Sequence, residues 1–244
     1  MDNFAIITGC DSGIGKSTAE YLAKNGWNIF ACVYKENEKT KIWASNLFKE
    51  TKKKIYINEI DLRSTISIKS AIKQIKSKKV HISSLVNVAG ITIDATVQMS
   101  RRDDIREVME VNMLGQVEFS QYALKTFSKT GHRSIVFVSS TAAFSGGFGQ
   151  LAYASSKAAI ANATKTFSRE LGPLGINVNA VAPGVINTNM NSVIDAKLLN
   201  TRIERTSLKR MGEALEVAKV IGFLLSKEAG HISSQVIKVD GGLL

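Results

Sequence analysis

The stretch FAIITGCDSGIG, residues 4–15, decides the fold, because it runs from a mostly apolar strand through a glycine-rich turn into a helix. The residues Phe4–Thr8 suit a strand that is buried on both faces. Gly9, Gly13 and Gly15 then let the backbone approach a bound group closely and leave helix N–H groups facing an anion. An ordinary strand–helix turn would look similar, so the position directly after the first strand is what favours a phosphate site.

Short apolar runs alternate with longer helical patterns along the rest of the chain. The strands that we expect are Phe4–Thr8, Asn28–Tyr34, Lys54–Glu59, Ser84–Val88, Ser134–Ser139, Asn177–Val181 and Val236–Val239. The expected helices lie near residues 15–24, 38–52, 64–78, 101–128, 152–171 and 213–226. This alternation predicts one doubly wound α/β domain over residues 1–244, with seven parallel strands and helices on both faces. Its ligand should bind at the carboxyl ends of the strands.

The composition is that of an ordinary globular protein, with 244 residues, 44% hydrophobic and 22% charged. We expect no membrane segment, because no apolar run approaches the roughly 20 residues that cross a bilayer. The start of the chain does not resemble a signal peptide. The only cysteines, Cys10 and Cys32, form no disulfide framework, which predicts a reducing cytoplasm. We expect no metal site.

The net charge of +11 is concentrated in residues 35–79, which contain 13 basic and five acidic residues. Two solvated, lysine-rich helix faces explain this charge best, because no nucleic-acid motif or aromatic interleaving accompanies it. We therefore expect no nucleic-acid partner. A surface for an acidic protein remains the alternative.

The end of the second expected strand bears on the choice of dinucleotide. An acidic residue there would accept hydrogen bonds from a free ribose 2′-OH and repel a 2′-phosphate. The chain instead has Val33 and Tyr34, followed by the cation Lys35. This pattern favours NADP(H) over NAD(H), although Glu36 opposes it and Ser12 supplies no charge from the glycine loop.

The stretch YASSK, residues 153–157, places Tyr153 and Lys157 on one face of the helix expected over 152–171. An ammonium there lowers the pKa of a phenol from about 10, which makes the phenol a usable acid or base. In isolation this pair would be incidental. However, Ser140 ends the fifth strand, where its hydroxyl can hold a carbonyl oxygen, and Asn112 lies in the long helix 101–128.

Together these residues resemble the short-chain dehydrogenase/reductase family over essentially the whole chain. The motifs that carry the resemblance are, in family order, TGCDSGIG (Thr8–Gly15), Asp61–Leu62, NVAG (Asn87–Gly90), Asn112, Ser140, Tyr153-x-x-x-Lys157, PGVINT (Pro183–Thr188) and VIKVDGG (Val236–Gly242). Within the family, AGITID (Ala89–Asp94), APGVINTNM (Ala182–Met190) and LLSKEAGHISSQVIKVDGG (Leu224–Gly242) look most like the 3-oxoacyl-[acyl carrier protein] reductases. Three positions, Val88, Ile93 and Ser234, depart from the pattern without touching the chemistry.

The resemblance implies a Rossmann-type fold and a role for each matching residue. Tyr153 protonates the oxygen of the carbonyl, Ser140 orients that carbonyl, and Lys157 lowers the phenol pKa and holds the nicotinamide ribose. Asn112 keeps a water that links Lys157 to solvent. The residues expected to contact the dinucleotide are Gly9, Ser12, Gly13, Ile14, Gly15, Tyr34, Lys35, Asp61, Leu62, Asn87, Gly90, Tyr153, Lys157, Pro183, Gly184, Ile186 and Thr188.

Three functions remain open at this stage. The first is an NADP(H)-dependent reductase of 3-oxoacyl thioesters, with an acidic carrier protein as a possible partner. The second is a dehydrogenase of a sugar, steroid or other small alcohol, and the third is a non-catalytic binding protein on the same scaffold. Residues 187–212, which we expect to form a lid, bear on the substrate. The resemblance and the small side chains of the 152–171 helix also predict a homotetramer.

Overall fold

The computed structural model of the protein describes residues 3–188 and 196–243. Seven parallel strands form one sheet in the order β3-β2-β1-β4-β5-β6-β9. They are β1 (Phe4–Thr8), β2 (Asn28–Val33), β3 (Ile55–Glu59), β4 (Ile82–Asn87), β5 (Arg133–Val138), β6 (Ile176–Pro183) and β9 (Val236–Val239). Each strand lies within a few residues of its predicted position, and the predicted doubly wound α/β fold is confirmed.

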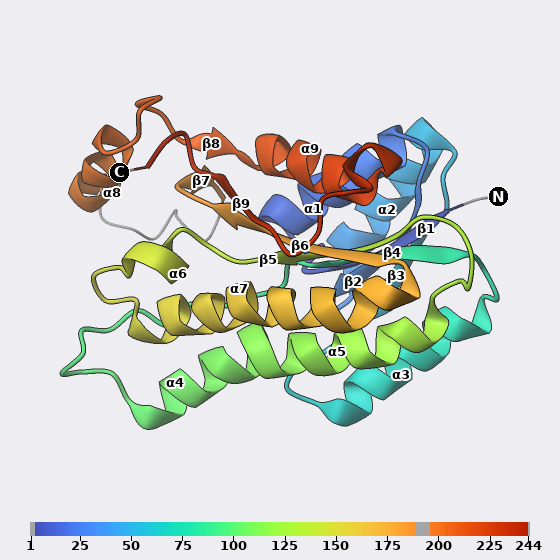
Figure 1. The fold of residues 1–244 in the computed structure, drawn as a ribbon, viewed down its shortest axis with the longest axis horizontal. Coiled ribbons are helices and arrows are strands. Elements are labelled where there is room, and N and C mark those ends of the chain that lie inside the picture. Colours follow the sequence, from blue (N-terminus) through green and yellow to red (C-terminus); the bar gives the residue numbers. More distant parts are fainter. Residues whose placement is uncertain (1–2, 189–195, 244) are drawn as a thin grey trace.

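Helices cover both faces of this sheet (Figure 1). One face carries α1 (Gly13–Lys24), α2 (Glu38–Thr51) and α9 (Ala214–Leu225). The other carries α3 (Thr65–Ser77), α4 (Arg102–Met109), α5 (Gly115–Ala123) and α7 (Leu151–Leu171). Among the described residues, no helix is long and apolar enough to span a membrane.

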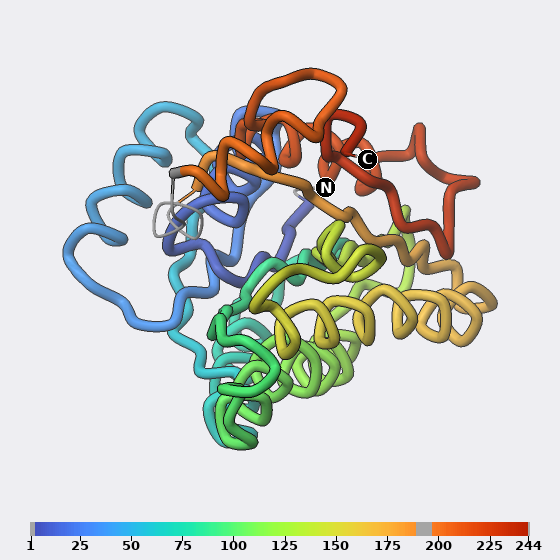
Figure 2. Tube along the Cα trace, turned by 90° about the vertical axis from the view of Figure 1, so that its left-hand side faces the viewer, coloured from blue at the N-terminus to red at the C-terminus, as the bar shows by residue number. Residues whose placement is uncertain are grey.

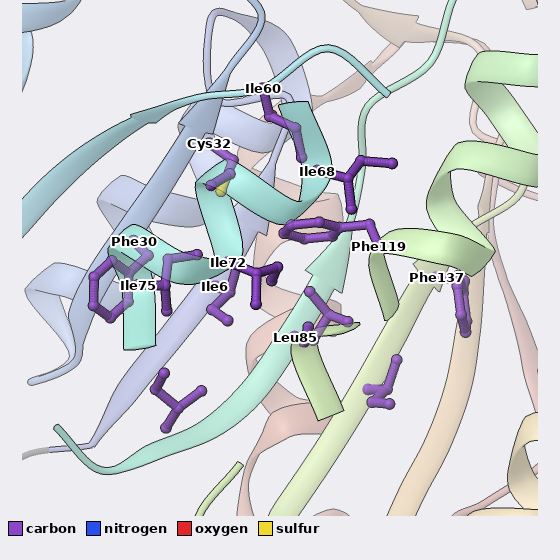
Figure 3. Packing of buried hydrophobic residues seen from close by; sticks show 14 of the residues in the cluster. Ile6, Phe30, Cys32, Ile60, Ile68, Ile72, Ile75, Leu85, Phe119 and Phe137 are labelled. Atoms are coloured by element: carbon purple, nitrogen blue, oxygen red, sulfur yellow. The ribbon is translucent and has the colours of Figure 1, made fainter. Parts of the chain in front are cut away.

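The core consists of two apolar layers, one on each face of the sheet. Strand side chains alternate between these layers, so that Ile6 packs toward α3 and α5 whereas Ile7 packs toward α1 and α9. Figure 3 shows Phe119 of α5 between the α3 residues and Leu85 of β4. Strands buried on both faces must be apolar throughout, which is why β1 was recognisable from its sequence.

The long helix expected over 101–128 is not continuous. α4 passes into a π-helix, η1 (Glu110–Leu114), before α5, and a 3₁₀ turn, η2 (Leu124–Thr126), follows. Gly115 begins α5 where a Cβ atom would lie 2.1 Å from the carbonyl oxygen of Leu62. The chain can therefore pass this close to the β3–α3 loop only because the residue is glycine.

Short elements gather beyond the carboxyl ends of the strands, the end of the molecule that Figure 2 faces. They are α6 (Ala142–Ser145), α8 (Ala196–Glu204) and a two-stranded sheet of β7 (Ile186–Asn187) and β8 (Gly212–Glu213). Two more 3₁₀ turns, η3 (Gly172–Leu174) and η4 (Lys227–Ala229), follow α7 and α9. The sequence did not predict α6, α8 or the small sheet, because each is too short for a periodic pattern.

Candidate active site

The glycine loop between β1 and α1 forms a close-packed turn. Gly9 has φ +72°, and a Cβ atom there would lie 2.9 Å from the backbone of Ala89. A Cβ atom on Gly15 would lie 2.1 Å from the carbonyl oxygen of Gly9. Since neither position admits a side chain, the loop keeps the bare backbone that a pyrophosphate needs beside it.

The first turn of α1 faces this loop without a side-chain cap. Ser12 is exposed and its hydroxyl makes no capping hydrogen bond, so the leading N–H groups of the helix stay available to an anion. Gly13 has φ +52°, and a Cβ atom there would lie 3.2 Å from the methyl group of Thr188. Ile14 packs against the α1 side of the core. Thr188 thus lies over the glycine loop, so that a dinucleotide bound there would contact both the glycine loop and the segment after β6.

The turn after β4 is tied to the end of β1. The hydroxyl oxygen of Thr8 accepts hydrogen bonds from the backbone N–H groups of Val88 and Ala89, at 3.0 and 3.1 Å. The Asn87 side chain is fully buried and donates to the hydroxyl of Ser120 in α5, 2.9 Å away. Its amide therefore points into the core, and only its backbone can line a groove at the strand ends.

Asn112 lies in the π-helix η1 and is fully buried. Its Oδ1 accepts from the backbone N–H of Ile91 at 2.8 Å, and its Nδ2 donates to the carbonyl oxygen of Ile91 at 2.9 Å. The second Nδ2 hydrogen goes to the hydroxyl of Ser156 on α7, 3.0 Å away. Asn112 therefore joins the turn after β4 to the helix that carries Tyr153, as π-bulges at functional sites often do.

The four residues that we expected to be catalytic come together at the carboxyl ends of β4 and β5. Ser140 lies two residues after the end of β5, and its hydroxyl hydrogen-bonds the hydroxyl of Tyr153. The ammonium of Lys157 lies 5.8 Å from the centre of the Tyr153 ring. A Cβ atom on Gly90 would lie 3.1 Å from Oδ1 of Asn112 and 3.3 Å from Nζ of Lys157. Gly90 thus leaves the space in which these side chains meet.

Burial dominates the acid–base properties of this cluster. It raises the pKa of Tyr153, the Ser140 hydrogen bond opposes this, and the charge of Asp94 adds to it. Burial also lowers the pKa of Lys157 to about 8. The ammonium donates to the carbonyl oxygen of Val138, 2.8 Å away, rather than to the phenol. The expected lowering of the phenol pKa by Lys157 is therefore not seen in this arrangement.

Two charged residues that the sequence analysis did not assign to the site lie at the end of β2. The carboxylate of Asp11, from the glycine loop, accepts from the backbone N–H of Tyr34 at 3.2 Å. The guanidinium of Arg63 donates to the Tyr34 hydroxyl at 2.5 Å and lies 5.2 Å from its ring centre. Asp11 lies within the predicted glycine motif, and Arg63 directly follows the predicted pair Asp61–Leu62. The sequence analysis therefore found both motifs but gave neither charged side chain a role.

The other residues expected near the adenosine differ in how far they are exposed to solvent. Arg63 holds the carboxylate of Asp61 through two hydrogen bonds of 2.9 and 3.1 Å, and these lower the pKa of Asp61. Leu62 is buried in the core, where its side chain packs beside Gly115. Tyr34 and Lys35 are exposed at the end of β2. The adenosine end of the groove is therefore more polar than the motifs suggest.

The segment after β6 lies on the other side of the glycine loop. Pro183 ends β6, and a Cβ atom on Gly184 would lie 2.7 Å from the Asp240 side chain. Ile186 is buried in β7. Of the expected lid, 187–212, the residues 189–195 lie outside the described residues, and with them Met190, Val193 and Ile194. Arg210, which belongs to the same segment, pairs with Glu216 at 2.7 Å.

These features can be compared with known proteins. Residues 9–244 match the protein family described as Enoyl-(Acyl carrier protein) reductase. The 3-oxoacyl-[acyl-carrier-protein] reductase FabG of Thermotoga maritima is 37% identical over 243 residues, which cover 98% of this chain and 96% of that protein. The enzyme of the same name from Aquifex aeolicus is 35% identical, with the same coverage. The chain belongs to the short-chain dehydrogenase/reductase family.

Solved structures of this family have the same fold. A short chain dehydrogenase from Burkholderia cenocepacia, in complex with NADP, superimposes with a TM-score of 0.91 at 27% identity, over 98% of this chain and 96% of that one. A short-chain dehydrogenase/reductase from Brucella melitensis, named as a glucose/ribitol dehydrogenase, gives a TM-score of 0.91 at 28% identity, over 100% and 96%. This short-chain dehydrogenase/reductase is therefore an NAD(P)-dependent oxidoreductase.

Proposed function

We propose that this enzyme reduces a 3-oxoacyl thioester to the 3-hydroxyacyl thioester with NADPH, in the cytoplasm and as one domain over residues 1–244. The observation that carries the proposal is the meeting of Ser140, Tyr153 and Lys157 at the carboxyl ends of the strands. The similarity to curated 3-oxoacyl-[acyl-carrier-protein] reductases supports the choice of substrate. A non-catalytic scaffold would have no need for this arrangement.

The residues present suit a nicotinamide dinucleotide, which supplies the hydride when it is bound. The bare glycine loop and the uncapped start of α1 would hold the pyrophosphate, and Thr188 would lie over it. Lys157 would turn from the carbonyl oxygen of Val138 toward the ribose hydroxyls. Pro183, Gly184 and Ile186, at the end of β6 and the start of β7, would border the nicotinamide.

The chain's own residues would handle the proton of the reaction. The Ser140 hydroxyl holds the substrate carbonyl oxygen, and the Tyr153 hydroxyl gives that oxygen its proton. A cationic Lys157 near the phenol stabilises the phenolate that remains. The hydrogen bond from Asn112 to Ser156 holds η1 beside the helix of Lys157. The backbone of Asn112 would there hold the water that links Lys157 to solvent.

Apolar side chains border the site, which supports an acyl substrate. Phe144 and Phe148, in the segment that joins Ser140 to Tyr153, are 53% and 79% exposed. Val97 and Met99, in the segment after β4, are 75% and 72% exposed. These two segments are tied together by a backbone hydrogen bond from Ala95 to Gly149. Large apolar groups exposed together on one surface are typical of a site that binds an apolar ligand.

A substrate panel with NADPH oxidation as the readout tests this proposal. It contains a 3-oxoacyl thioester, an enoyl thioester, a keto sugar and a ketosteroid, each assayed with the wild-type enzyme and Tyr153→Phe. We expect the 3-oxoacyl thioester to have a kcat/KM at least about tenfold above the others, about 1.4 kcal/mol of transition-state preference. A better sugar or steroid substrate would overturn the substrate assignment and leave the oxidoreductase chemistry in place.

We also propose a homotetramer and an acidic acyl carrier protein as the bearer of the substrate. The carrier follows from the names of the relatives, and the tetramer from the family resemblance and the small side chains of α7 (Ala154, Ala158, Ala159, Ala161 and Ala163). Light scattering at micromolar concentration checks the tetramer, and a monomer would refute it. A carrier-bound thioester should have a lower KM than the same acyl group on pantetheine, and this advantage should fall with added salt.

A further inference from the structure

The adenosine end of the proposed dinucleotide groove holds two opposed charges, neither of which belongs to β2. We propose that Arg63 and Asp11 determine the cofactor preference of this enzyme by opposite effects, Arg63 in favour of NADPH and Asp11 in favour of NADH. In this proposal Arg63 binds the 2′-phosphate of NADPH, and Asp11 accepts from the 2′-OH of NADH and repels the phosphate. The inference rests on the proposed use of a nicotinamide dinucleotide.

The position of Arg63 suits a phosphate contact. Its guanidinium reaches from the β3–α3 loop to the hydroxyl of Tyr34, at the strand end where the 2′ substituent is normally read. The side chain is 37% exposed, so an anion can reach it. Asp61 and Glu107 hold the guanidinium at 2.9 and 3.2 Å and thereby fix its orientation. Four of its five N–H groups are donated to Asp61, Glu107 and the Tyr34 hydroxyl. A phosphate that displaces the Tyr34 hydroxyl would therefore receive that N–H together with the free N–H of Nη1.

Asp11 supplies the acidic group that β2 lacks. Its carboxylate reaches the end of β2 from the glycine loop and accepts from the backbone N–H of Tyr34. Desolvation raises the pKa of this carboxyl, although the residue as a whole is exposed to solvent. The Asp11 carboxylate contacts Tyr34, the residue that follows Val33. It therefore lies close to the place that an acidic side chain at position 33 would occupy. It would therefore favour a ribose hydroxyl over a phosphate.

The lysines of this region are less suited to recognising the phosphate. The ammonium of Lys16 lies over the ring of Trp43 in α2, 6.0 Å from its centre. Lys35 is exposed at the surface, where solvent and salt weaken its attraction to an anion. Arg63, which neighbouring groups hold in place, is therefore the stronger candidate than Lys35.

The test is the dissociation constant of NADPH and of NADH, measured by calorimetry on the purified full chain. The variants are Arg63→Gln, Asp11→Asn and Lys35→Gln, the last of which removes the competing cation at the end of β2. We expect Arg63→Gln to weaken NADPH binding about tenfold or more and NADH binding by less than about threefold. Asp11→Asn should do the opposite, weakening NADH and strengthening NADPH. Lys35→Gln should change neither by more than about threefold at 0.15 M salt.

Several outcomes would overturn the proposal. Equal weakening of both dinucleotides by Arg63→Gln would mean that Arg63 only supports the fold around Tyr34. No change in either variant, or a larger effect of Lys35→Gln, would also exclude it. Melting temperatures of all variants identify any loss of fold. The wild-type ratio of the two constants tests the proposed NADPH preference separately, because the predicted directions of change hold whichever cofactor the wild-type enzyme prefers.

Discussion

The Nζ atom of Lys157 donates a hydrogen bond to the carbonyl oxygen of Val138, 2.8 Å away, and the residue is only 3% exposed. Burial lowers the pKa of this ammonium from 10.5 to about 8. Such a change corresponds to roughly 3 kcal/mol against the charged form at neutral pH. A residue needed at the proposed reaction centre therefore destabilises the folded chain.

Lys157→Met should consequently stabilise the fold while it removes activity. Methionine has a similar length and carries no charge, so the variant loses the desolvation cost. We expect the free energy of unfolding at pH 7 to rise by about 1–3 kcal/mol, and the melting temperature by a few degrees. Differential scanning calorimetry measures this, and an equal or lower melting temperature would contradict the buried-charge interpretation.

The same residue predicts how stability depends on pH. Below about pH 8 Lys157 is protonated in both the folded and the unfolded chain, so the cost is fully present. Between about pH 8 and the unfolded pKa of 10.5 only the unfolded chain keeps the proton, so the Lys157 contribution to folding becomes more favourable as pH rises. Urea unfolding of the wild type and Lys157→Met at pH 7.5 and pH 10 should show their difference shrinking. A constant difference would contradict the lowered pKa.

Tyr153→Phe should separate chemistry from binding. The phenylalanine keeps the ring on α7 and removes only the hydroxyl that hydrogen-bonds Ser140. We expect turnover to fall by two or more orders of magnitude, the usual effect of losing a positioned acid, with dinucleotide affinity nearly unchanged. Steady-state kinetics and calorimetry measure the two quantities. Near-normal turnover would refute the role of Tyr153.

The strands could be predicted from sequence because burial on both faces leaves a strong signal. β1 and β2 are buried at every residue, so their sequences are nearly continuous apolar runs. The break of the helix 101–128 could not be predicted, because the apolar pattern hardly changes where the π-helix η1 begins. Asn112 was a signal there, since a mid-helix asparagine is unfavourable unless it has a polar task.

The candidate site was predictable where the chemistry is local in sequence. Tyr153 and Lys157 share a helix face because they lie four residues apart. The charges at the end of β2 were not predictable, because Asp11 and Arg63 approach Tyr34 from 23 and 29 residues away. Nor could spacing alone show that the Lys157 ammonium turns to Val138.

The glycine loop offers a steric prediction. In Gly15→Ala the new Cβ atom would lie 2.1 Å from the carbonyl oxygen of Gly9, a backbone atom that can yield only if the loop moves. We expect a loss of about 1–3 kcal/mol in stability and at least about tenfold in dinucleotide affinity. Gly172→Ala is the control, because a Cβ atom there meets nothing within 4 Å. If both variants bind the dinucleotide equally well, the loop does not form the phosphate site.

Ser156, which is fully buried, joins the catalytic helix to the π-helix η1. Its hydroxyl donates to the carbonyl oxygen of Tyr153 at 2.7 Å and accepts from Nδ2 of Asn112 at 3.0 Å. Ser156→Ala leaves one buried N–H of Asn112 without its acceptor, which costs about 1–3 kcal/mol. Turnover should fall with it, because Asn112 loses its link to α7. The exposed neighbour offers the control Ser155→Ala, which should change stability by less than about 0.5 kcal/mol.

A double-mutant cycle tests whether Ser156 acts through Asn112. In an Asn112→Ala background the serine has no amide left to accept from, so adding Ser156→Ala should lower stability and turnover much less than it does in the wild type. The two bonds between Asn112 and Ile91 make Asn112→Ala the more damaging single change. Urea unfolding and kcat of the four proteins supply the cycle. Fully additive effects would mean that the hydroxyl matters only through its hydrogen bond to Tyr153, and the link between α7 and η1 would then have no part in placing the catalytic residues.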